Sequence, residues 1–497
     1  MNSMANLGEL VSAACRDHQG ALAIESASNT LSYTQLLDTA SALAARLRQL
    51  EAGPHEPVHV RVSNQPQDFA AFLGVWLAGC VVVPVHRTSP AAVTDRILDK
   101  TRARFIVDIA TATTTPEAAI ADCGTGAPPA RAQLEGAALI IFTSGSTGAP
   151  KGVVVTHQAF AGKLLAIDAM VHFRRAERTL LLLNITFSFG IWVGLLTLLG
   201  GGTVVLPEKF DPALLLAQLR GERIYRVGVV PTMLRALLSL APTLERDAQA
   251  FACPALHQIL TGGEQLSEQL ASQIETLFPN ADLINIFGLT ETSTCDFFQF
   301  PNYRRARPLS LGLPSSHVDF RVVDETMTPV SAGAIGELQI RSPYLMRGYL
   351  DEPELTTAAF AGPWFRTGDL AVLAEEGEVR LMGRHKELIV RGGNKVTPME
   401  IEQATMLFEG VGAAMAVGAP DAILGERIHV LIVPFAGSAV DLAALRSFLG
   451  GRLEKYKIPD FFYVGEALPT GRTGKADRRE LRSMIASGEL APLTSKA

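Results

Sequence analysis

The sequence predicts an α/β protein with a large N-terminal domain of mixed and parallel sheets, helices and a small β subdomain, followed by a small α+β domain. Three observations support this prediction. The chain has 497 residues, enough for two or three domains. Short apolar runs alternate with helical patterns over its first three quarters, which is typical of parallel sheets. Beyond about residue 310 the runs alternate in polarity and are separated by turns, which is typical of antiparallel strands.

The first three quarters contain the predicted βα units. The expected elements are Val58–Val62, Asp68–Leu77, Val81–Val85, Phe105–Ile109, Val227–Val230 and Thr232–Leu240. The uncharged segment Thr179–Pro207 is long enough to span a bilayer, but it contains polar residues and a triple-glycine break. It is therefore predicted to be a buried helix between the strands Leu180–Leu183 and Thr203–Leu206. The stretch Ala110–Pro129 is expected to be an irregular surface connection.

The last third of the sequence predicts a small β subdomain, which is followed by a separate C-terminal domain. Its expected strands are Val318–Val323, Gly336–Arg341, Leu370–Ala374 and Glu378–Met382. After Arg384 the chain begins again with a strand at Leu388–Val390 and a helix at Pro398–Phe408, which opens with proline and two glutamates. The predicted domains are therefore residues 1–384 and residues 387–497.

Composition excludes several classes of protein. Hydrophobic residues make up 48% and charged residues 19%, which excludes a disordered chain. The net charge of −6 argues against a nucleic-acid-binding protein, and the basic cluster Arg304–Arg307 is expected to be a solvated loop. The five cysteines have neither disulfide nor zinc spacing, and the N-terminus lacks a basic, apolar signal. These features predict a reducing, cytoplasmic setting. Cys295 is expected to be a free buried thiol.

A hydroxyl- and glycine-rich loop is the strongest chemical feature. Four apolar residues, 139–142, run into the segment Thr143–Gly152, which Lys151 closes. Glycine lets backbone N–H groups face an anion, hydroxyls add donors and lysine adds a positive charge, so the loop suits a polyphosphate. Because Pro150 precedes Lys151 and Gly152 follows it, this is not the phosphate loop of P-loop phosphotransferases. The candidate phosphate-binding residues are Thr143, Ser144, Gly145, Ser146, Thr147, Gly148 and Lys151.

Two further motifs place carboxylates beside turns. Thr290 and Glu291 follow Phe287 and Gly288, and a carboxylate near a triphosphate requires a cation between them, so Glu291 is a candidate magnesium ligand. Asp369 follows a Thr-Gly pair and precedes an apolar run, which predicts a turn before a strand. A carboxylate there can accept strong hydrogen bonds from two adjacent ribose hydroxyls, whereas a turn cap is the structural alternative.

Taken in order, these motifs resemble the acyl-adenylate-forming superfamily, which includes acyl-CoA synthetases, adenylation domains of peptide synthetases and luciferases. The resemblance spans nearly the whole chain and implies ATP, Mg²⁺ and CoA as ligands. It implies that Thr147 and Glu291 hold the metal, that Thr290 shares the catalytic motif and that Asp369 and Arg384 bind the ribose. It places Phe287 and Gly288 against the adenine. The turn that lines the adenine and acyl pockets is Gly262, Gly263 and Glu264.

The resemblance also implies a mobile C-terminal domain. Lys386 matches the position of the family's hinge, and Lys475, in the glycine-rich segment Pro469–Lys475, matches its catalytic lysine. Acyl adenylation brings a carboxylate against the α-phosphate, so a lysine there would offset the repulsion between two anions. His385 is expected to be an exposed linker residue. Gly393 would let the narrow pantetheine arm of a thiol pass close to the backbone.

The acid is predicted to lack an α-amino group. No acidic residue lies between Arg178 and Glu208, where amino-acid-activating relatives carry an aspartate, and an unpaired buried ammonium is costly. An aryl or aliphatic carboxylate is expected, with Phe187, Ser188 and Gly190 as pocket candidates together with Gly262. The pattern from Arg391 to Glu402 favours CoA as acceptor. A carrier-protein pantetheine, an amine, and a nucleotide-binding sensor without catalysis remain as alternatives.

Overall fold

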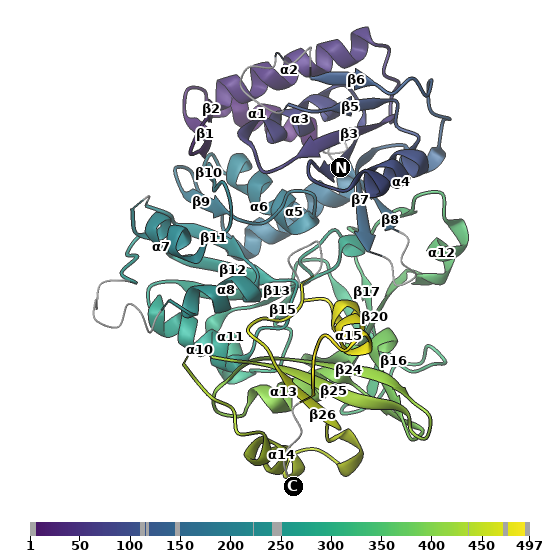
Figure 1. Ribbon diagram of the computed structural model, residues 1–497. Helices are drawn as coiled ribbons and strands as arrows, with labels where there is room; N and C mark the ends of the chain where they lie inside the picture. The colour runs from purple at the N-terminus through teal and green to yellow at the C-terminus, as the bar shows by residue number, and fades with distance from the viewer. Residues whose placement is uncertain are drawn as a thin grey trace.

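The computed structural model describes residues 6–109, 115, 119–144, 150–221, 223–240, 251–435, 437–470 and 476–492, without the side chain of Ser144. Two large sheets and a smaller antiparallel sheet precede a separate C-terminal sheet. Figure 1 shows the C-terminal elements, coloured green to yellow, gathered at the end of the molecule opposite α2 (Tyr33–Gln49). The predicted fold class is confirmed.

The nine-stranded sheet has the order β15-β14-β13-β12-β11-β9-β10-β1-β2. Its strands are β1 (Leu22–Ser26), β2 (Thr30–Ser32), β9 (Arg178–Leu181), β10 (Thr203–Leu206), β11 (Arg226–Val229), β12 (Gln258–Gly262), β13 (Asp282–Phe287), β14 (Phe297–Gln299) and β15 (Leu313–Pro314). Its middle strands are parallel. The carboxyl ends of β9, β11, β12 and β13 therefore lie at one edge, which is where α/β sheets place ligands.

The seven-stranded sheet has the order β18-β8-β7-β4-β3-β5-β6. Its strands are β3 (Pro57–Val62), β4 (Val81–His86), β5 (Phe105–Val107), β6 (Ile120–Asp122), β7 (Ala137–Ser144), β8 (Pro150–Thr156) and β18 (Gly348–Tyr349). β4 is buried on both faces: Val82 belongs to the main hydrophobic cluster, while Val81, Val83 and Val85 face a second cluster that includes Ile97. A run of β-branched residues suits such a strand.

Helices fill the layers around these sheets. They are α1 (Leu7–Asp17), α2, α3 (Pro66–Leu77), α4 (Ala91–Thr101), α5 (His157–Val171), α6 (Ser188–Leu199), α7 (Pro212–Gly221), α8 (Pro231–Leu238), α10 (Glu268–Leu277), α11 (Pro301–Ala306) and α12 (Pro353–Ala358), with the short turns η1 (Ala132–Leu134) and η2 (Thr290–Thr292). The main cluster joins α1, α2, α3, α5 and α6 to both large sheets, and α7, α8 and α10 cover the other face of the nine-stranded sheet.

The predicted buried helix between β9 and β10 is α6. None of the helices in the described ranges combines the length and apolarity needed to cross a bilayer. The predicted irregular stretch Ala110–Pro129 is partly outside the described residues, and it contributes the short strand β6 at Ile120–Asp122.

The antiparallel sheet contains β16 (Asp319–Val323), β17 (Ile335–Arg341), β19 (Phe360–Ala361), β20 (Trp364–Leu373) and β21 (Val379–Arg384). Here one expectation was wrong. Asp369 lies inside β20, opposite Arg384 of β21, rather than in a turn before a strand. In the β17–β20 pairing, residues 367–369 of β20 face a single residue of β17, so the Thr-Gly pair is accommodated in the strand as a bulge.

The C-terminal sheet contains β22 (Ile389–Arg391), β23 (Asn394–Val396), β24 (Val411–Asp421), β25 (Gly425–Pro434) and β26 (Phe461–Val464). Around it lie η3 (His385–Glu387), α13 (Pro398–Met406), α14 (Leu442–Gly450), η4 (Lys455–Lys457) and α15 (Arg478–Ser487). These strands share a hydrophobic cluster of their own. The chain thus leaves the antiparallel sheet at Arg384 and enters the C-terminal sheet at Ile389.

The basic cluster Arg304–Arg307 is a second correction. It forms the end of α11 rather than a solvated loop, and Arg304 is 2% exposed. The Arg304 guanidinium donates to the carbonyl of Leu283 and forms an ion pair with Glu275, so this arginine serves the fold. Cys295 is buried and free, as predicted.

Candidate active site

The predicted phosphate loop connects the antiparallel strands β7 and β8. Thr143 pairs with Lys151, and Ser144 pairs with Pro150, at the end of two buried strands. The turn itself, which holds the predicted residues Gly145, Ser146, Thr147 and Gly148, lies outside the described residues. The predicted metal ligand Thr147 is therefore not placed.

Lys151 lies among charges brought from distant segments. Its ammonium is 5.2 Å from the centre of the Tyr349 ring. Partial burial lowers the pKa of Lys151, the positive charge of Lys386 lowers it further, and the carboxylates of Glu291 and Glu352 raise it. The predicted phosphate-binding Lys151 therefore lies within electrostatic range of the predicted metal ligand Glu291 and of the predicted hinge residue Lys386.

Thr290 and Glu291 form the start of η2, directly beyond β13. The Tyr349 hydroxyl donates to Glu291 Oε1 at 3.0 Å, and the Met346 amide donates to the Glu291 carbonyl at 2.7 Å. Burial, followed by the charge of Glu291, raises the pKa of Tyr349, so its hydroxyl stays a donor. Sequence reasoning assigned Tyr349 no role, although the Arg-Gly-Tyr triplet fits the superfamily pattern.

Asp369 is buried, and only one of its two carboxylate oxygens has a hydrogen-bond partner among the described residues. Its Oδ1 accepts from Arg384 Nε at 2.8 Å, whereas its Oδ2 has no hydrogen-bond partner among the described residues. Burial raises the pKa of Asp369 from 3.8 to about 6; Arg384 opposes this shift, while Glu387 and Glu291 add to it. A buried carboxylate oxygen without a donor is costly, so this atom is suited to a hydroxyl group from a ligand.

The predicted glycine-rich turn follows β12 at the same sheet edge. Gly262 is the last residue of β12, and Gly263 follows with φ +82°. The carboxylate of Glu264 accepts from the Thr232 hydroxyl at 2.8 Å and pairs with Arg235 at 3.1 Å, so it is held at the start of α8. Phe287 ends β13, and its ring centre is 6.1 Å from that of Phe297. Gly288 leads from β13 into η2.

The predicted acyl-pocket residues lie where α6 begins. Phe187 precedes the helix and is partly exposed, while Ser188 is its first residue and is buried. An added Cβ at Gly190 would lie 2.4 Å from the Asn184 carbonyl oxygen. Gly190 therefore serves the close packing of α6 on the preceding loop. Compared with Gly190, the partly exposed Phe187 is the better candidate for lining an acyl pocket.

The remaining predicted residues lie in the C-terminal part. Lys386 is exposed in η3, next to the exposed His385, and Gly393 is exposed in the turn between β22 and β23. Lys475 lies outside the described residues. The two ends of its loop are held together, because Thr470 bridges to Ala476 and the Asp477 amide donates to the Pro469 carbonyl at 2.9 Å.

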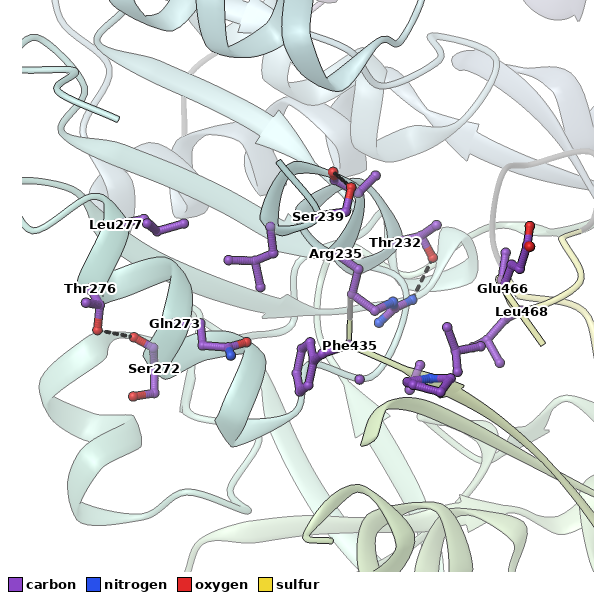
Figure 2. A pocket seen from close by; sticks show the side chains of 17 residues that line it. Thr232, Arg235, Ser239, Ser272, Gln273, Thr276, Leu277, Phe435, Glu466 and Leu468 are labelled. Carbon is purple, nitrogen blue, oxygen red and sulfur yellow. Dashed lines mark hydrogen bonds between the residues drawn. The ribbon is translucent and has the colours of Figure 1, made fainter. Parts of the chain in front are cut away.

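A cavity of about 630 Å³ separates α8 and α10 from the C-terminal sheet (Figure 2). Figure 2 shows Thr232 and Arg235 on one side and Phe435, Glu466 and Leu468 on the other. Leu468 immediately precedes the segment that carries Lys475. The C-terminal sheet and Leu468 therefore face α8, the helix whose first turn holds Glu264.

Comparison with known proteins agrees with this geometry. Residues 11–350 match the family model for AMP-binding enzymes, and residues 400–475 match the model for the AMP-binding enzyme C-terminal domain. A feruloyl-CoA synthase from Amycolatopsis is 29% identical over 475 residues, covering 93% of this chain and 95% of that protein. A 2-succinylbenzoate–CoA ligase from Staphylococcus aureus is 34% identical over 349 residues, covering 70% of this chain and 67% of that protein.

Solved structures share the fold. The amide bond synthetase McbA from Marinactinospora thermotolerans superimposes with a TM-score of 0.84 at 24% identity, covering 96% of this chain and 99% of that chain. At this identity the likeness concerns the arrangement of the elements.

Proposed function

The chain belongs to the family of AMP-binding enzymes, and on this premise we propose that it is an AMP-forming acid–CoA ligase. In the first half-reaction an oxygen of the carboxylic acid attacks the α-phosphorus of ATP, and pyrophosphate leaves. In the second, the thiolate sulfur of CoA attacks the acyl carbon, and AMP leaves. The observation that carries the proposal is that Lys151 and Glu291 both contact Tyr349, while the buried Asp369, held by Arg384, lies within electrostatic range of Glu291.

Each of these residues has a distinct task. Lys151 offers a positive charge to the phosphates. Asp369 Oδ2 accepts from the ribose, and Arg384 keeps the Asp369 carboxylate oriented. Glu291, whose carboxylate Tyr349 orients, suits Mg²⁺, which binds proteins through one or two carboxylates and otherwise through substrate phosphates. When bound, the metal neutralises phosphate charge. Thr147 completes the proposed metal site, and Lys475 supplies the proposed cation at the reacting centre.

The two proposed domains divide the work. Residues 1–384 bind the nucleotide and the acid, and residues 387–497 rotate about Lys386, withdrawing Lys475 and presenting the face of Gly393 to the thiol. The free cysteines fit a reducing, cytoplasmic compartment. The names of the feruloyl and succinylbenzoate relatives specify aromatic acids, so we propose an aromatic carboxylic acid as the substrate.

Product analysis tests the proposed function. Purified protein is incubated with ATP, Mg²⁺ and a panel of aryl and aliphatic acids, with and without CoA, and mass spectrometry detects acyl-AMP and acyl-CoA. We expect acyl-AMP from aryl acids without CoA and acyl-CoA with it. Acyl-AMP that accumulates and ignores CoA would overturn the acceptor in favour of a carrier protein or an amine. Absence of turnover with every acid would favour a nucleotide-binding sensor.

Tyr349→Phe is expected to lower acyl-AMP formation about tenfold at limiting Mg²⁺, because a hydrogen bond to a charged group contributes about 1.5–3 kcal/mol. ATP–pyrophosphate exchange measured against free Mg²⁺ checks this. Tyr463→Phe is the control, since it removes a hydroxyl that bonds His429 in the C-terminal sheet. Equal exchange rates in the wild type and Tyr349→Phe would contradict the role of Tyr349.

The KM for ATP is expected to rise about tenfold between pH 7 and pH 5. With a pKa of about 6, Asp369 is about nine-tenths protonated at pH 5, and the apparent affinity scales with the ionised fraction. Because folding raises this pKa above 3.8, the carboxyl stabilises the fold most below about pH 4, and this contribution is lost as pH rises through 6. Asp369→Asn is expected to raise the KM and to flatten its pH profile. A profile for Asp369→Asn as steep as that of the wild type would contradict the assignment.

A further inference from the structure

A completely buried ion pair lies beneath η2. Lys163 of α5 and Asp296, between η2 and β14, are both 0% exposed, and Lys163 Nζ is 2.8 Å from Asp296 Oδ1. Neither residue belongs to any of the sequence motifs described above. Removing two charges from water is costly, and a well-packed apolar pair at such a place is often at least as stable. The pair is therefore more readily explained by what it positions than by stability.

Asp296 holds both ends of the segment that carries Glu291. Its carboxylate accepts a hydrogen bond from the Thr292 hydroxyl, and Thr292 in turn accepts from the Leu289 amide at 3.2 Å. The Asp296 amide donates to the Phe287 carbonyl at 2.7 Å. Asp296 thus links the end of β13, through its amide, to η2, through its carboxylate.

Lys163 contacts the part of the same segment that leads from η2 to β14. Its ammonium donates to the Cys295 carbonyl at 3.3 Å and lies 5.1 Å from the centre of the Tyr344 ring. The Ser293 hydroxyl donates to the Tyr344 carbonyl at 2.6 Å, and Met346, two residues on, donates to the Glu291 carbonyl. Lys163 therefore binds the segment that follows η2 and contacts the irregular segment, residues 342–347, that leads to Tyr349.

The backbone between these contacts is strained. Ser293, Thr294 and Cys295 have φ values of +57°, +74° and +46°, a region that non-glycine residues rarely adopt, β-branched ones least of all. Such a conformation persists only where the surroundings determine it, and it is concentrated at functional sites. Here the surroundings are the buried pair and its hydrogen bonds.

We propose that Lys163 and Asp296 are a positioning pair that fixes Glu291 opposite Lys151. The connection is direct, because α5 follows β8 immediately, so one βα unit carries Lys151 at its start and Lys163 in its helix. The ion pair locks that unit to η2. The inference rests on the proposed function, since it assigns the pair to the half-reaction that uses ATP.

Lys163→Met, Asp296→Asn and the double variant test the pair, with Arg226→Met as the matched control. Arg226 is also 0% exposed and pairs with Glu177 at 3.2 Å, but it lies at the opposite, amino end of β11. Four quantities are measured for each variant. They are the Tm, the rates of acyl-AMP formation and of thioester formation from supplied acyl-AMP, and the amide hydrogen exchange of the peptide 287–296 without any ligand.

The single variants are expected to lower the Tm, and the double variant to recover most of it, because neither charge is then left alone. All three are expected to slow acyl-AMP formation at least about tenfold and to leave thioester formation within about twofold. Exchange in 287–296 is expected to rise in all three. Arg226→Met is expected to lower the Tm while leaving both the exchange in 287–296 and the ratio of the two half-reactions unchanged.

Three results would overturn the proposal. If the double variant recovers acyl-AMP formation together with the Tm, the pair serves stability alone. If both half-reactions fall equally, the pair has no particular relation to Glu291. A wild-type protein that forms no acyl-AMP would overturn the proposed function, whereas unchanged exchange in 287–296 of the variants would still overturn the positioning role on its own.

Discussion

Lys475→Ala is expected to lower acyl-AMP formation by about 10²- to 10³-fold and to leave thioester formation from supplied acyl-AMP within about twofold. The carboxylate and the α-phosphate repel each other as they approach, and a cation placed between them acts mainly in the transition state. The second half-reaction has a neutral acyl carbon as its electrophile, so it has less need of this cation.

The described residues next to Lys475 explain how one loop could bring a charge to the reacting atoms. Arg478, the first residue of α15, forms ion pairs with Glu402 of α13 and with Glu387 of η3. The base of the Lys475 loop is thereby tied to the residue after the proposed hinge, Lys386. Rotation at the hinge would move the loop as a unit with the C-terminal sheet.

ATP–pyrophosphate exchange reports the first half-reaction, and mass spectrometry of acyl-CoA formed from synthetic acyl-AMP reports the second. Lys455→Ala is the matched control, because Lys455 is an exposed lysine of the same domain in η4. We expect this control to retain both rates. Equal loss of both half-reactions in Lys475→Ala would contradict the division of labour between the two domains.

The fold was largely predictable because its strands are local apolar runs. Val81–Val85 is a valine-rich buried run and Val58–Val62 alternates valine with polar residues, so the apolar pattern places both strands within a residue of their observed bounds. The site was predictable where a motif follows the carboxyl end of a strand, as the Glu264 and Glu291 motifs do after β12 and β13. Parallel pairing of β11, β12 and β13 then brings Thr232, Glu264 and Glu291 to one sheet edge.

Contacts between distant segments were not predictable in the same way. Lys163 and Asp296 are separated by 133 residues, and a single lysine in a helical pattern is typical of a solvated face. Arg304 likewise resembles a surface charge until its packing against Leu283 is known. The strand position of Asp369 depends on its pairing with Arg384, and Tyr349 gains its role only because Glu291 lies beside its hydroxyl. In each case tertiary packing decides the environment, and local pattern does not encode it.

Gly393→Phe is expected to have the opposite effect to Lys475→Ala. In this structure an added Cβ at Gly393 meets nothing within 4 Å, and the turn between β22 and β23 is exposed. Acyl-AMP formation is therefore expected to stay within about threefold of the wild-type rate. After rotation, the same position would face the thiol, and a bulky side chain in a narrow passage costs about 3 kcal/mol, so thioester formation is expected to fall about 100-fold.

The backbone strain of such a substitution needs its own control. Gly393 has φ +81°, which penalises any side chain by about 1–2 kcal/mol wherever it occurs. Gly377, in the turn between β20 and β21, has φ +82° and equally open surroundings, so Gly377→Phe introduces the same strain in the other domain. If Gly377→Phe spares both half-reactions while Gly393→Phe loses only the second, strain is excluded as the cause. Loss of acyl-AMP formation in Gly393→Phe would show instead that this turn already acts in the first half-reaction, and the proposed rotation about Lys386 would have to be abandoned.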